Sequence, residues 1–142
     1  MLTVKYLVDF MVNARPEDLQ EVLIGSGRRF EDCTLAELVE AGNLCLVDTE
    51  DDSVYAIGGI ANENVIWMLC TSKVEKHFVK FLRYCRETLR YLLEDRKILY
   101  NNVWKENELH VKWLKWMGAE FLKETDTHIL FIFRKRKEAL DV

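Results

Sequence analysis

The pattern of apolar and polar positions predicts a chain that mixes helices with strands. Residues 3–12 are rich in Val, Tyr and Phe and predict a first strand. A short helix is predicted next, because Pro16 suits a first helical turn and Gly25 suits a helix end. The spacing of Thr34 and Glu37 is that of a capping box and predicts a second short helix.

The middle of the chain predicts three consecutive strands, over residues 44–47, 54–60 and 65–70. The pair Gly58-Gly59 indicates either a β-bulge or a close approach of another backbone. The third run is nearly all apolar, which is typical of a central strand buried on both faces. Three strands joined by short turns imply antiparallel hairpins.

The longest helix is predicted over residues 73–95. Ser72 and Glu75 have the spacing of a capping box at its start, and apolar side chains recur every three or four positions along it. A strand over residues 97–104 follows.

The last third of the chain predicts a helix over residues 107–117 and then one or two strands over residues 119–135. Asn107 is a good N-cap for this helix, and Gly118 suits the left-handed residue that ends it. The strand–helix–strand order implies a parallel crossover. We therefore expect an α/β fold, with a mixed, mostly antiparallel sheet flanked by about four helices.

Length and composition favour a single domain over residues 1–142, with residues 134–142 as a basic-to-polar C-terminal tail. Residues 1–71 hold 4 basic and 13 acidic residues, whereas residues 72–142 hold 16 basic and 11 acidic residues. The basic half is compatible with an anionic ligand and equally with solvated helix faces. Binding of nucleic acid rests on this charge alone, so it is not favoured.

The four cysteines lie far apart and form no C-x-x-C pair, so a zinc ribbon or a dithiol motif is not supported. A reduced, cytosolic setting is favoured. The N-terminus lacks the features of a signal peptide, and no apolar run has the length of a membrane span.

Residues 107–119 carry a resemblance. The predicted element order, together with Asn107, the apolar positions after it and Gly118-Ala119, resembles the GCN5-related N-acetyltransferase (GNAT) superfamily. Residues 101–121 and 55–72 also look like the small internal virion proteins of short-tailed phages. The first resemblance implies acetyl-CoA as a cofactor and places Asn107 near its pantetheine.

The resemblance also implies a set of cofactor-binding residues: Leu69, Thr71, Ser72, Lys73, Lys76 and Asn107. In the superfamily, a glycine-rich loop before the long helix holds the pyrophosphate with backbone N–H groups. The matching loop here contains no glycine, and Glu75 would repel a phosphate. Pyrophosphate binding and simple helix capping therefore both remain open for this loop.

The catalytic groups implied by the resemblance are incomplete. The superfamily often uses a tyrosine in its fourth helix as general acid, and Leu114 stands at the matching position. Tyr100 is the nearest replacement, and His110 is a candidate general base. Both also suit structural roles, Tyr100 as a half-buried strand residue and His110 as a packed one. No two histidines have a spacing that favours a metal site.

The sequence is therefore compatible with two functions. One is an acetyl-CoA-dependent N-acetyltransferase-like protein encoded by a phage. The alternative is a non-catalytic internal virion or host-interaction protein on the same fold. Trp113 and Trp116 cannot both face the core stripe of their helix, so we expect one of them to contact a protein partner, with a homo-oligomer as a further option. The corresponding locations are the host cytoplasm and the interior of the virion.

Overall fold

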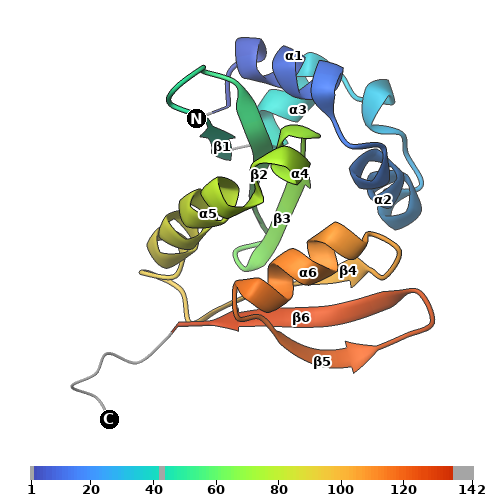
Figure 1. Ribbon diagram of the computed structural model, residues 1–142. Coiled ribbons are helices and arrows are strands. Elements are labelled where there is room, and N and C mark those ends of the chain that lie inside the picture. The colour runs from blue at the N-terminus through green and yellow to red at the C-terminus, as the bar shows by residue number, and fades with distance from the viewer. Residues whose placement is uncertain (1, 42–43, 136–142) are drawn as a thin grey trace. The chain divides into compact units, whose positions relative to one another are not determined.

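The computed structural model describes residues 2–41 and 44–135 (Figure 1). It contains two compact units, residues 1–81 (unit 1) and residues 82–142 (unit 2), and each is described by itself. A single domain over residues 1–142 stays a prediction. Of the predicted tail, residues 136–142 lie outside the described residues.

The three predicted strands of unit 1 are confirmed as β1 (Leu44–Val47), β2 (Val54–Ala61) and β3 (Val65–Cys70). They form an antiparallel meander in which β2 pairs with both neighbours. The complete burial predicted for β3 is wrong. Only its last two residues are buried, and its first four are partly exposed.

Gly58 marks a close backbone approach rather than a bulge. Its pairing with Met68 continues the regular register of β2 and β3. A Cβ atom at position 58 would lie 2.5 Å from the backbone oxygen of Trp67, nearer than a carbon and an oxygen can pack. Of the two alternatives that the glycine pair indicated, the structure therefore selects the second at this residue.

The prediction of a first strand is wrong, because residues 4–13 form helix α1 (Val4–Asn13). Thr3 is its N-cap, and its Oγ1 accepts a hydrogen bond from the amide of Tyr6 at 3.3 Å. Leu7 and Phe10 are three positions apart and both fully buried, and α1 packs on β2 (Figure 1). The packing of this helical face outweighs the strand propensity of the β-branched and aromatic side chains.

The next elements of unit 1 are α2 (Pro16–Ser26), a short 3-10 helix η1 (Phe30–Asp32) and α3 (Leu35–Ala41). Pro16 begins α2 as predicted. The helix ends at Gly27 rather than Gly25, because Gly27 is the residue with a left-handed φ of 71°. The predicted cap of α3 is confirmed, since the amide of Glu37 donates to Oγ1 of Thr34 at 3.2 Å.

The longest predicted helix is broken into α4 (Lys73–Lys76) and α5 (Phe78–Leu92). The break falls at His77, whose φ of −131° and ψ of 46° are not helical. The predicted capping box at Ser72 does not form. Ser72 already has helical backbone angles, and its side chain makes no capping hydrogen bond. The boundary between the two units falls inside α5, after residue 81.

Unit 2 contains β4 (Ile98–Trp104), α6 (Glu108–Trp116), β5 (Glu120–Glu124) and β6 (His128–Arg134). Both β4 and β5 pair with β6 in the antiparallel sense. It follows that β4 and β5 run parallel to each other with β6 between them, and α6 forms the predicted crossover (Figure 1). The register of β5 shifts between Phe121 and Lys123, and most of its residues are exposed.

The core of unit 2 is rich in aromatic side chains. The ring of Phe133 packs edge-on against both Trp113 and Phe131, with ring centroids 6.1 and 5.8 Å apart. Gly118 ends α6 as predicted, with a left-handed φ of 85°. Asn107 precedes α6 and its carbonyl accepts from the amide of Val111 at 3.2 Å, but its side chain makes no capping hydrogen bond, so the predicted side-chain cap is wrong.

The structure confirms an α/β fold whose strand pairs within each unit are antiparallel. Within the described residues there are six α-helices instead of about four, since the first predicted strand is helical and the longest helix is divided. All four cysteines are free, and Cys70 and Cys85 are buried as small core residues. No helix in the described part of the chain combines the length and apolar character needed to cross a membrane.

Candidate functional site

The predicted pyrophosphate loop lies between β3 and α4, and several of its backbone amides donate to carbonyls of the chain. The amide of Thr71 donates to the carbonyl oxygen of Tyr55 and the amide of Ser72 to that of Asn13, both at 2.9 Å. Inside α4, the amide of Val74 donates to the carbonyl of Thr71 at 3.2 Å. An anion at this loop would have to displace these bonds, because an N–H group held by a carbonyl is not available to a phosphate oxygen.

The side chains predicted to bind the cofactor here are in different environments. Leu69 is buried in β3, opposite Ile57. Thr71 is fully buried, and its hydroxyl donates to the carbonyl of Val54 at 2.8 Å. Ser72 and Lys76 are exposed. The role of these residues in binding acetyl-CoA stays a prediction.

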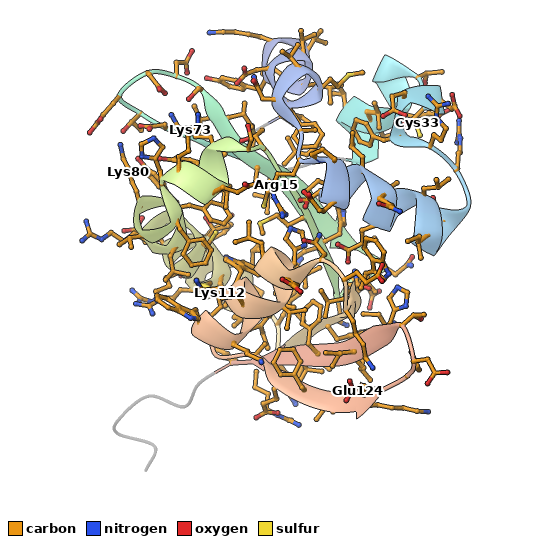
Figure 2. The ribbon with its side chains drawn as sticks, turned by 45° about the vertical axis from the view of Figure 1, so that its right-hand side comes forward. Arg15, Cys33, Lys73, Lys80, Lys112 and Glu124 are labelled. Atoms are coloured by element: carbon orange, nitrogen blue, oxygen red, sulfur yellow. The ribbon has the colours of Figure 1, made fainter. Side chains whose placement is uncertain are left out.

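Lys73 belongs to a network of charges around Asp48, which lies directly after β1. Its Nζ is 3.1 Å from Oδ2 of Asp48 and 2.7 Å from Oδ2 of Asp51. Nζ of Lys80 donates to Oδ1 of Asp48 at 2.9 Å, and Oη of Tyr55 donates to Oδ2 at 3.1 Å. Figure 2 shows Lys73 and Lys80 beside each other at the start of α4 and α5. We call Asp48, Asp51, Tyr55, Lys73 and Lys80 the Asp48 network.

The network shifts the pKa values of its members. Hydrogen bonds from the amide of Glu50 and from Lys80 hold the pKa of Asp48 well below its ordinary value. The bond from Lys73 lowers the pKa of Asp51 to about 2. The bond to Asp48 raises the pKa of Lys80. All of these carboxylates and ammonium groups are therefore charged at neutral pH, and they neutralise one another.

A second polar centre of unit 1 is Arg15, which is almost completely buried (Figure 2). Its guanidinium donates to Oδ1 of Asp18 at 2.5 Å and to Oε1 of Glu75 at 2.9 Å. Asp18 also accepts from the amide of Cys70 at 2.5 Å, and the amide of Arg15 donates to the carbonyl of Cys70 at 3.0 Å. Burial opposes the charge of Arg15, but the carboxylates around it outweigh that effect and raise its pKa. These bonds fix the start of α2 to the end of β3.

The predicted site residues of unit 2 differ in their access to solvent. Asn107 is fully buried at the start of α6, and His110 is 8% exposed in the first turn. Tyr100 lies in the middle of β4, opposite Ile132, with 37% of its surface exposed. The catalytic roles of Tyr100 and His110 stay predictions.

The two tryptophans of α6 differ in their exposure to solvent. Trp113 is 8% exposed and packs in the core, whereas Trp116 is 51% exposed. Nζ of Lys112 lies 5.6 Å from the centroid of the Trp116 ring. Of the two candidates for a partner contact, only Trp116 has the exposure that such a contact needs.

Trp116 lies at the wall of an open groove of about 860 Å³ in unit 2. The groove is formed by one face of α5, the end of α6 and the end of β6. Its lining residues are Arg86, Leu89, Arg90, Leu93, Glu94, Trp116, Met117, Gly118, Phe133, Arg134 and Lys135. Apolar side chains and cations therefore share this surface.

Sequence reasoning missed the Asp48 network, Arg15 and the groove. The acidic residues at 48–52 lie in one of the short turns between the predicted strands, and an acidic run that precedes lysines at helix starts is a usable signal. Arg15 directly precedes Pro16, and its position in the sequence gives no sign of its burial. The basic charge of residues 72–142 is visible in the sequence, but the exposed arginines of α5 could not be connected to Trp116 without the fold.

The chain has a fold like that of the GCN5-related N-acetyltransferases, as its similarity to a solved structure shows. A chimera of the spermidine N-acetyltransferase SpeG from Vibrio cholerae and hSSAT matches with a TM-score of 0.57 and 14% sequence identity, over 86% of this chain and 94% of that chain. The N-acetyltransferase PseH from Campylobacter jejuni, solved in complex with acetyl coenzyme A, matches with a TM-score of 0.47 and 10% identity, over 86% of this chain and 93% of that chain.

The amino-acid sequence itself matches a known protein family. The family described as "Bacteriophage T7, probable scaffold protein Gp13" matches residues 44–126, which is more than half of the chain. The chain belongs to this family. The match runs from the first strand of unit 1 to the turn between β5 and β6, so it includes residues of both units. No curated protein matches the chain.

Proposed function

We propose that the protein is a non-catalytic assembly protein of a phage particle, which uses a GNAT-like fold to contact other proteins. The observation that carries the proposal is the loop between β3 and α4. The amides of Thr71 and Ser72 donate to carbonyls of the chain, and the side chain of Lys73 pairs with Asp48 and Asp51. These bonds leave fewer groups at the loop to receive a pyrophosphate, which supports a non-catalytic role.

Membership of a family described as a probable scaffold protein supports the same function. The position of the superfamily's acid tyrosine is taken by Leu114, which cannot donate a proton and is buried in the core. The location that follows from this proposal is the host cytoplasm during assembly, or the interior of the particle.

The test is to purify assembly intermediates and mature particles from infected cells that make the protein, and to quantify the chain in each by mass spectrometry. We expect the chain in the intermediates at a fixed ratio to the major capsid protein. Retention in mature particles would identify an internal virion protein, and loss on maturation a scaffold. Absence of the chain from both would overturn the proposal.

Acetyl-CoA binding is the second candidate, and the GNAT-like fold with the buried Asn107 at the start of α6 favours it. Calorimetric titration of acetyl-CoA tests it, with Asn107→Ala and the exposed Lys76→Ala as variants. Saturable binding that both variants weaken would support a working cofactor site. Lys76→Ala separates lost contacts from lost folding, because an exposed lysine contributes little to stability. No heat of binding at millimolar acetyl-CoA would exclude this candidate.

A further inference from the structure

The groove of unit 2 carries more positive charge than its surroundings neutralise. Arg86 and Arg90 lie four residues apart on α5, both exposed, and neither has an ion pair with any residue that the structure describes. Arg134 pairs with Glu120 at 2.7 Å, which lies outside the groove lining. The single carboxylate of the lining is Glu94. An anionic partner would therefore find two uncommitted guanidinium groups here.

Part of the groove lining is apolar. Leu93, Met117 and Phe133 are buried lining residues, and Trp116 is an exposed one. Apolar side chains flanked by arginines, with an exposed tryptophan, are the features that concentrate binding energy at protein interfaces. The chemistry of the groove therefore fits a polypeptide that offers both carboxylates and apolar side chains.

Unit 1 contains such a polypeptide surface. Residues 16–41, which form α2, η1 and α3, hold seven acidic and two basic residues. Asp18 is buried against Arg15, so the surface of the segment carries six acids and two bases, a net charge of −4. On α2, Leu23 and Ile24 are large apolar side chains that remain 41% and 43% exposed. We call residues 16–41 the acidic segment.

We propose that the groove of one molecule binds the acidic segment of a second copy of the chain. The observations that carry it are the two uncommitted arginines and the exposed Trp116 in the groove, matched by the net charge and the exposed Leu23 and Ile24 of the segment. The choice of a second copy as the partner rests on the proposed assembly function and on the opposite charges of the two surfaces.

The two surfaces of this contact are different, so each molecule can bind two others in a head-to-tail contact. A head-to-tail contact leaves one groove and one acidic segment free at the ends of every dimer. Further copies can then add, and the products are rings or open chains rather than a closed two-fold dimer. Because the attraction is partly electrostatic, the association weakens as salt is added.

The experiment uses sedimentation velocity on the full chain over a concentration series at low and high salt. The groove variant is Arg86→Glu/Arg90→Glu. The segment variant reverses three exposed acids, Glu31→Lys/Asp32→Lys/Glu40→Lys. The matched control is Arg83→Glu/Lys123→Glu, which changes the net charge as the groove variant does but lies outside the groove lining. Circular dichroism shows whether each variant is folded.

We expect the wild type and the control to form species larger than dimers as concentration rises. The groove variant and the segment variant should each associate at least about tenfold more weakly, because like charges then face each other. Mixing these two variants should restore 1:1 association, since each supplies the surface that the other lacks. Trp116→Ala should weaken association of the wild type by roughly tenfold or more.

A wild type that stays monomeric at millimolar concentration would overturn the proposal, as would a mixture of the two variants that forms no dimer. An equal loss of association in the control would also overturn it, because the effect would then be one of net charge. A fluorescent single-stranded oligonucleotide provides the remaining comparison. Nucleic acid is the occupant of the groove if three results occur together. The oligonucleotide binds the wild type, this binding is lost in the groove variant, and the bound oligonucleotide prevents self-association. If the chain occurs in assembly intermediates but is monomeric, the assembly function stands and the self-contact does not.

Discussion

The charged side chains of unit 1 and unit 2 have different surroundings. In unit 1, Arg15 is buried with Asp18, and Lys73 and Lys80 are bound to Asp48. In unit 2, most buried side chains are apolar or aromatic, Asn107 and His110 are the buried polar ones among the described residues, and the arginines of α5 face solvent. The difference indicates that the charges of unit 1 serve its folding, whereas those of the unit 2 groove are available for a partner.

The largest effect that can test this contrast is expected from Asp18→Ala. The change leaves the guanidinium of Arg15 buried without its main counter-ion, and breaking a buried pair in this way costs about 3–5 kcal/mol of unfolding free energy. Urea denaturation followed by circular dichroism measures it. Asp32→Ala, at an exposed position of the same unit, is the control and should change stability by less than about 0.5 kcal/mol. A cost for Asp18→Ala no larger than the control's would contradict the folding role assigned to this pair.

In unit 2, the corresponding change is Trp113→Leu. The smaller side chain leaves a cavity next to Phe133, and we expect a loss of roughly 2 kcal/mol. Since the contact is apolar, the loss should be the same at low and high salt. Trp116→Leu on the same helix is the matched control, because its ring is 51% exposed and its replacement should cost less than about 0.5 kcal/mol. A strong salt dependence of the Trp113 effect would show that the two cores do not differ as described.

The third prediction concerns pH and the Asp48 network. The pKa values of Asp48 and Asp51 are lower in the folded protein than in the unfolded chain, so their contribution to stability is complete above the ordinary carboxyl pKa near 4. It is lost as the pH falls from about 4 through the folded pKa of Asp51, about 2. Thermal unfolding at a series of pH values should show this decline, and Asp48→Asn should flatten it. The exposed Asp126→Asn should leave the profile unchanged, and an equal flattening by both variants would contradict the assignment.

The smallest effect on stability is expected from Arg86→Ala/Arg90→Ala. These side chains are exposed and make no ion pair with the described residues, so removing them should change the unfolding free energy by less than about 0.5 kcal/mol. Differential scanning calorimetry measures this change. A loss above 1 kcal/mol would mean that unit 2 uses these arginines for folding, as unit 1 uses Lys73 and Lys80.

The sequence predicted those parts of the fold that depend on neighbouring residues. The strands of unit 1, the cap between Thr34 and Glu37 and the left-handed Gly118 all follow from side chains within a few positions of one another. At these positions the local sequence determines the structure, and the tertiary contacts favour the same structure.

The sequence predictions are wrong where contacts between residues far apart in the chain determine the local structure. Glu75 was expected to help cap a helix, but it accepts a hydrogen bond from Arg15, 60 positions earlier in the chain. Residues 3–12 have a strand-like composition, but the burial of Leu7 and Phe10 against β2 selects a helix. The groove was equally inaccessible to sequence reasoning, because α5, α6 and β6 each contribute only part of its lining.

Strand β5 has a consequence for the behaviour of the protein at high concentration. It pairs with β6, its register shifts near Phe121, and its exposed residues include Glu120, Lys123 and Glu124. An irregular, charged edge strand is a poor template for the main chain of another molecule. β5 is therefore a poor site for sheet extension between crowded copies, which favours side-chain contacts such as the one proposed for the groove.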